Sequence, residues 1–91
     1  MPRAKFYSHF TKFTKGDKET DIEGTNVKEA IDSLASKYGD TFRNQLLREN
    51  GEPKEFVRIF LNNQDIRLLG NLGTATGPDD QLLFVPAVAG G

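Results

Sequence analysis

The chain has 91 residues, with 12 basic and 13 acidic side chains, a formal net charge of -1 and a pI near 5.8. This balance argues against binding of nucleic acid, which needs a basic stripe or a strongly basic domain. The chain has no cysteine and only one histidine, His9, which excludes disulfides, thiolate zinc sites, a cysteine nucleophile and a multi-histidine metal centre. Its apolar runs are only a few residues long and it starts without a secretory signal, so we expect a cytoplasmic protein that crosses no membrane.

Alternating apolar and polar residues predict a strand over residues 3–13. Ala4, Phe6 and Phe10 fall on one face of this strand, and Tyr7 and His9 fall on the other. The glycine-containing residues 15–18 supply a turn, and residues 19–23 are expected to return as a short second strand.

Helical spacing follows. Apolar side chains recur at i, i+3, i+4, i+7 and i+11, namely at Val27, Ala30, Ile31, Leu34 and Tyr38. Thr25 or Asn26 can cap the first turn, with Glu29 placed for a capping box, and Gly39 is suited to the C-terminal end. A second, short helix is expected within residues 40–49.

The second half of the chain predicts three further extended segments. Residues 55–61 alternate and form the strongest strand pattern, and residues 62–65 are a polar connector to a short strand or extended piece at 66–69. Residues 70–81 form a loop that is long for a compact domain. The apolar run 82–85 predicts a strand in the middle of a sheet, ended by Pro86.

Side chains offer little support for catalysis. His9 is expected to be a solvated surface residue, and the glycines between 70 and 77 lack the spacing of a phosphate-binding loop. The lysines at 12, 15 and 18 cluster near the predicted turn and are interrupted by Asp17 and Glu19, which is typical of a solvated turn. No metal site is predicted.

The last two residues, Gly90 and Gly91, are the most informative. Two successive glycines occur by chance at roughly half a per cent of positions, and an accidental or frayed end is the alternative explanation. Without a Cβ, both residues fit a slot too narrow for other residues. Such an arm could present its terminal carboxylate inside a partner's active site, where adenylation would activate it. Capture by sulfide would then give a thiocarboxylate, and capture by an amine would give an isopeptide bond.

The segment 82–91, a strand followed by Pro, small residues and Gly-Gly, resembles the end of the MoaD/ThiS-like β-grasp sulfur carriers, which include small archaeal modifier proteins. Residues 56–62 resemble the family's strand that ends in Asn, and residues 5–10 its aromatic first strand. The resemblance implies an α+β, ubiquitin-like β-grasp domain over residues 1–86, with a mixed sheet of about four to five strands on one main helix. Residues 87–91 would be an extended, flexible tail. The length of residues 40–53 argues against the shorter thiamine-pathway carrier.

The resemblance also implies a carrier that is not catalytic alone and binds no cofactor. An ATP-dependent activating enzyme would adenylate Gly91, which would become a thiocarboxylate. The large subunit of a molybdopterin synthase would then accept Pro86, Ala87, Val88, Ala89 and Gly90 in its active site and take the sulfur for the molybdenum or tungsten cofactor. The alternative is a modifier joined through Gly91 to lysines of target proteins, with a further role in transfer-RNA thiolation.

Periodicity also predicts a docking surface. If the predicted core residues face the helix, then Tyr7, Phe56, Phe60 and Val85 remain on the open face of the sheet, where an apolar patch is a candidate for partner binding. The alternative is that aromatic residues simply favour strands and are half covered by neighbours such as Arg58.

Overall fold

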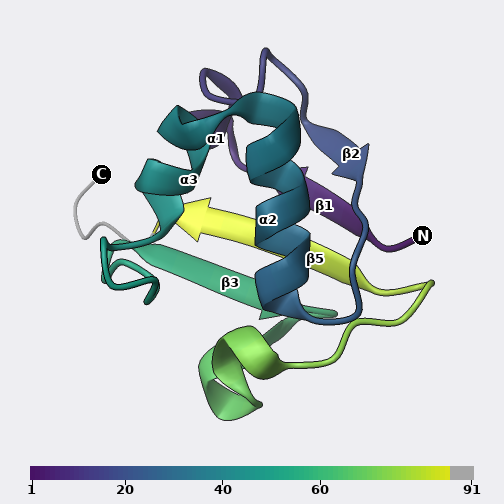
Figure 1. Ribbon diagram of the computed structural model, residues 1–91. Coiled ribbons are helices and arrows are strands. Elements are labelled where there is room, and N and C mark those ends of the chain that lie inside the picture. The colour runs from purple at the N-terminus through teal and green to yellow at the C-terminus, as the bar shows by residue number, and fades with distance from the viewer. Residues whose placement is uncertain (87–91) are drawn as a thin grey trace.

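One long helix lies across one face of a five-stranded mixed sheet in the computed structural model, which describes residues 1–86 (Figure 1). The predicted α+β class is therefore confirmed. The elements in chain order are β1 (Arg3–Phe6), α1 (Ser8–Thr11), β2 (Glu19–Asp21), α2 (Val27–Tyr38), α3 (Asp40–Leu46), β3 (Val57–Leu61), β4 (Gln64–Asp65), the 3₁₀ turns η1 (Ile66–Leu68) and η2 (Asn71–Gly73), and β5 (Gln81–Pro86).

The strand order is β2-β1-β5-β3-β4, so the last strand lies at the centre of the sheet. β5 runs parallel to β1, with Lys5 opposite Leu83, and antiparallel to β3, with Phe60 opposite Leu83. The prediction of a central strand at 82–85 is confirmed. The described part of the chain ends with this strand, which pairs with β1 on one side and with β3 on the other.

The core lies between the sheet and α2. Its buried side chains come from alternate positions of β1, β3 and β5 and from one stripe of α2. Phe6, Tyr38, Phe42 and Phe84 form an aromatic cluster whose ring centroids lie 5.6–6.4 Å apart. This cluster joins α2 and α3 to β1 and β5.

The first turn of α2 is capped as the sequence predicts. The Asn26 side chain accepts a hydrogen bond from the Glu29 N–H (2.8 Å), and the Glu29 carboxylate accepts from the Thr25 N–H (2.7 Å) and hydroxyl (2.9 Å). These bonds to Thr25 lower the pKa of Glu29. Gly39, with φ of 96°, ends the helix.

The predicted strand over residues 3–13 is wrong beyond Phe6. The chain turns at Tyr7 into α1, which brings Phe10 into the core. Phe6 and Phe10 are four residues apart, a spacing that fits a helical turn as well as alternation. The loop that follows is closed by the buried Thr14, whose hydroxyl donates to the Asp17 carbonyl (2.7 Å).

The expected strand at 66–69 is also wrong, and the polar connector before it holds β4. Asn62 and Asn63 have φ of 49° and 73°, values that suit a tight hairpin turn from β3 into β4. The Asp65 carboxylate then accepts from the Arg67 N–H (2.9 Å) and starts η1. Loop 70–81 contains η2 and a backbone bridge between Asn26 and Ala75.

Candidate functional site

Of the site predicted at the C-terminus, the structure describes only Pro86. Pro86 is half-buried at the end of β5, opposite Val57 of β3. Ala87, Val88, Ala89, Gly90 and Gly91 lie outside the described residues. The structure therefore shows the root of the predicted arm, held in the central strand.

The open face of the sheet carries an apolar patch that we call the open-face patch: Tyr7, Phe60, Leu83 and Val85. Leu83 lies opposite both Lys5 and Phe60, and Val85 lies opposite Arg58. The Tyr7 N–H bonds the Phe84 carbonyl, so Tyr7 is level with Val85. Tyr7 is 50% exposed, and the other three are half-buried. The structure brings together three residues that the sequence predicted here, and it adds Leu83.

Leu83 was missed because an unbroken apolar run does not show which of its residues face the core. The burial of Leu82 and Phe84 settles this, because side chains alternate along a strand and Leu83 must then point to the open face. Lys5, Phe60, Asn62 and Leu83 line part of a shallow hollow of about 270 Å³ on this face.

Phe56 does not share this hollow. It is 61% exposed, but it lies in the turn before β3, where it lines a separate hollow with Arg48, Lys54 and Glu55. The predicted strand began two residues too early, at residue 55, because β3 starts at Val57.

Charged side chains border the open-face patch at both edges of the sheet. Arg3 lies 2.6 Å from both Glu19 and Asp21, and the bond to Glu19 raises the pKa of Arg3. At the other edge the Asp65 carboxylate lies 2.8 Å from Arg67 and 3.6 Å from Arg58. An apolar centre between charged borders suits the docking of another protein.

Other polar side chains of residues 1–86 either hold the fold together or face solvent. The Tyr38 hydroxyl donates a hydrogen bond to the Asp17 carboxylate (2.7 Å), which joins loop 12–18 to α2. Burial, together with this bond, raises the pKa of Tyr38 to about 12. His9 is exposed on α1, as expected. Within the described part of the chain, no group of three or more His, Asp or Glu side chains is placed to hold a metal ion. None of the helices there has the length and apolar character needed to cross a membrane.

A family model named ThiS matches residues 5–91. The chain belongs to the ThiS family. The sulfur carrier protein CysO of Mycobacterium tuberculosis is 34% identical over 79 residues, which cover 86% of this chain and 85% of that protein. The family predicted from the sequence is thereby confirmed.

Solved structures agree with this assignment. The crystal structure of the Amycolatopsis orientalis BexX/CysO complex contains a chain with a TM-score of 0.91 and 27% identity, matched over 100% of both chains. The small archaeal modifier protein 1 of Methanosarcina acetivorans has a TM-score of 0.85 at 24% identity, over 99% of this chain and 95% of that one, and shows the fold alone. The fold of the ThiS-family chain is the ubiquitin-like β-grasp.

Proposed function

We propose that this chain is a sulfur carrier whose Gly91 carboxylate is activated and converted to a thiocarboxylate. The observation that carries the proposal is the family match, which runs through residue 91 and includes the Gly-Gly end together with the β-grasp domain. A relative matched over most of this chain is itself named a sulfur carrier. The described residues offer binding surfaces but no catalytic cluster, which suits a protein that is acted upon.

The chemistry has two steps that other proteins catalyse in the cytoplasm. A Gly91 carboxylate oxygen attacks the α-phosphate of ATP, pyrophosphate leaves, and an acyl-adenylate forms. Sulfide, or a sulfur donor at the same oxidation level, then attacks the acyl carbon and releases AMP. One terminal oxygen is thereby replaced by sulfur, with no net oxidation. The β-grasp domain contributes a rigid support, because β5 is paired with β1 up to Phe84 and with β3 up to Pro86.

We propose the open-face patch as the surface that docks on the activating enzyme. It lies on the same strand that leads to the tail, so an enzyme that holds Leu83 and Val85 also fixes the direction in which the arm leaves. Its half-buried centre is apolar and its borders carry ion pairs. An interface of this kind derives affinity from the centre and orientation from the rim.

For the destination of the sulfur we propose the large subunit of a molybdopterin synthase, with Pro86, Ala87, Val88, Ala89 and Gly90 inside its active site. The alternative is conjugation of Gly91 to lysines of target proteins, with a further role in transfer-RNA thiolation. Both use the same activated carboxylate, so only the products distinguish them.

Intact-mass measurement tests the carrier proposal. The full chain is incubated with ATP, its cognate activating enzyme and a sulfide source, and we expect one terminal oxygen to be exchanged for sulfur. A chain that lacks Gly91 is the control and should stay unmodified. Tail remnants on lysines of other proteins would instead support the modifier. An unchanged mass under conditions in which the enzyme forms an adenylate with a known substrate would refute both.

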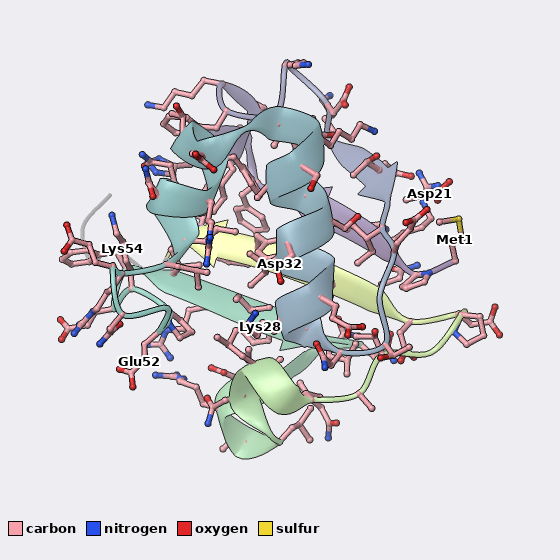
Figure 2. The ribbon with its side chains drawn as sticks, viewed as in Figure 1. Met1, Asp21, Lys28, Asp32, Glu52 and Lys54 are labelled. Carbon is pink, nitrogen blue, oxygen red and sulfur yellow. The ribbon has the colours of Figure 1, made fainter. Side chains whose placement is uncertain are left out.

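The docking proposal predicts that Tyr7→Ala and Phe60→Glu each lower the rate of activation by about ten-fold, the equivalent of 1.4 kcal/mol of binding energy. Lys28→Glu is the matched control, because Lys28 is exposed on α2, on the opposite side of the sheet (Figure 2). All three variants should keep the melting temperature within a few degrees of the parent. Unfolding of the Tyr7 or Phe60 variant would assign these side chains to the core instead.

A further inference from the structure

The 3₁₀ turn η1 and the residue that follows it expose two neighbouring leucines. Leu68 is 82% exposed and Leu69 is 41% exposed. Of the large apolar side chains that are exposed within residues 1–86, only these two are adjacent in the sequence. Single exposed apolar residues are ordinary, whereas contiguous ones mark sites of contact with another molecule. We call Arg67, Leu68 and Leu69 the leucine crest.

The leucine crest is held in place by its own neighbours. Ile66, at its start, is buried in the core. The Asp65 carboxylate accepts a hydrogen bond from the Arg67 N–H (2.9 Å) and lies 2.8 Å from the Arg67 guanidinium. The Leu69 N–H bonds the Ile66 carbonyl (3.0 Å). A crest that is already ordered loses little conformational entropy when it binds.

A groove of about 530 Å³ lies beside the leucine crest. The turn 52–55 forms one wall, and residues 66–67 and 70–73 form the other, so the crest leucines lie between two segments that line the groove. Side chains at its floor, such as Ile59, belong to the core. The accessible apolar surface therefore comes from the walls, where Pro53 and Leu72 are half-buried.

The charges of the groove differ from those of the leucine crest. Three carboxylates and two cations line the groove: Glu52, Glu55, Asp65, Lys54 and Arg67. Glu55 is bound to Arg48 (3.0 Å), and Asp65 is shared by Arg67 and Arg58. Glu52, on the turn before β3 (Figure 2), is exposed and has no ion pair among residues 1–86. The groove thus offers a free carboxylate, and the crest offers a guanidinium whose carboxylate has a second partner.

We propose that a second copy of this chain docks here across a two-fold axis. The leucine crest of each copy would enter the groove of the other, with Leu68 against Pro53 and Leu72 and with Arg67 near Glu52. Both halves of the contact lie side by side on one chain, which is the arrangement that a self-complementary, two-fold interface requires. Apolar groups match apolar groups, and opposite charges meet. The contact is small, so the dimer belongs to the weak, transient class.

Sedimentation equilibrium of the full chain tests the contact. We expect a monomer–dimer equilibrium with a dissociation constant on the order of 0.1–1 mM. Leu68→Ala should raise this constant by at least about ten-fold, because the two-fold symmetry removes the leucine twice. The melting temperature should stay within a few degrees of the parent, since Leu68 is largely exposed within its own chain.

Tyr7→Ala is the comparison, because it removes an exposed side chain from the open-face patch instead. This variant should dimerise like the parent. A chain that stays monomeric up to about 1 mM overturns the proposal. A dimer that Leu68→Ala leaves intact also overturns it, and loss of that dimer in Tyr7→Ala would place the contact on the open face of the sheet.

An exchange of charges tests the two-fold pairing itself. Arg67→Glu alone would set two carboxylates together at both ends of the dimer, and Glu52→Arg alone would set two guanidinium groups together. Each variant should therefore dimerise several-fold more weakly than the parent. In an equimolar mixture, the mixed dimer again has opposite charges at both ends and should recover the parent affinity. A mixture that associates no better than either variant overturns the pairing. Gly91 and the open-face patch play no part in this contact, so the result is independent of the sulfur-carrier test.

Discussion

At Gly24 the backbone leaves almost no freedom in the choice of residue. Its φ is 126°, and a Cβ built there would lie 2.6 Å from the Glu29 Cβ and 3.0 Å from the Glu29 carbonyl carbon. Gly24 also presents its carbonyl to the Thr76 hydroxyl (3.3 Å). The position therefore fixes how the chain enters α2 and how loop 70–81 packs beside it.

Gly24→Ala should cost more stability than Gly16→Ala. Gly16 also has a positive φ, 84°, but nothing lies within 4 Å of its Cβ position. It therefore carries only the backbone penalty, about 1 kcal/mol. At Gly24 the clash adds to this, and we expect a total of about 2–4 kcal/mol. Urea denaturation of the two variants measures the difference, and equal costs would show that the loop relaxes around the new methyl group.

Asp80 makes stability depend on pH at the start of β5. The Gly77 N–H (2.7 Å) and the Asn62 side-chain amide (2.7 Å) donate to its carboxylate and lower the pKa of Asp80. These bonds favour the ionised form in the folded state. The stabilisation is therefore complete above the ordinary Asp pKa of about 3.9 and is lost as pH falls through the lower folded pKa.

Asp80→Asn should accordingly lower the free energy of unfolding near pH 7, and the gap to the parent should close below about pH 4. Asp79→Asn is the control, because Asp79 is exposed and donates or accepts no side-chain hydrogen bond within residues 1–86. Urea titrations at several pH values provide the comparison. A gap that widens on acidification would contradict the sign of the Asp80 effect.

Among the elements, α2 has an N-terminal cap whose contribution to the free energy of unfolding can be measured. Asn26 accepts the Glu29 N–H, one of the donors that a helix start leaves unbonded. Asn26→Ala should cost about 1 kcal/mol and lower the melting temperature by about 4–8 °C. Asn44→Ala, at an exposed position within α3, should change the melting temperature little. A cost below 0.3 kcal/mol at Asn26 would show that Thr25 or water replaces the cap.

The elements that sequence reasoning recovered are those with many repeats of one period. The stripe of α2 spans three turns, and β3 alternates over its whole length. Two short elements were predicted wrongly because three or four residues cannot define a period: α1 was included in the first strand, and η1 was taken as extended. The 3₁₀ start at Asp65 depends on a bond to Arg67, two residues away, which apolar periodicity does not register.

At the scale of the molecule, Phe42 connects both layers. It is fully buried and its ring lies 5.6 Å from those of Phe6 and Tyr38 and 6.4 Å from that of Phe84. Phe42→Ala should cost about 3–5 kcal/mol, a large part of the 5–15 kcal/mol typical of a domain. Phe56→Ala, at an exposed ring, should cost less than about 1 kcal/mol. Similar melting temperatures for the two variants would rule out a central role for the cluster.

The candidate site could be predicted only in part, because the Gly-Gly end follows from residue identities alone, whereas the open-face patch depends on how the strands are arranged. The Gly-Gly end and the family can be read directly from residue identities. The open-face patch requires knowing which face of β5 is covered, and this is why Leu83 was absent and Phe56 was included.

The parallel pairing of β1 with β5 also has a consequence for how the chain is made. Lys5 of β1 can pair with Leu83 of β5 only after nearly the whole chain has been synthesised. Until then only pairs that are close in sequence, such as β1 with β2 and β3 with β4, can form. The sheet closes only when β5 leaves the ribosome. Leu83 and Val85 complete the open-face patch at that same moment. An enzyme that recognises this patch would therefore ignore unfinished or unfolded chains and activate only those in which synthesis and folding are complete.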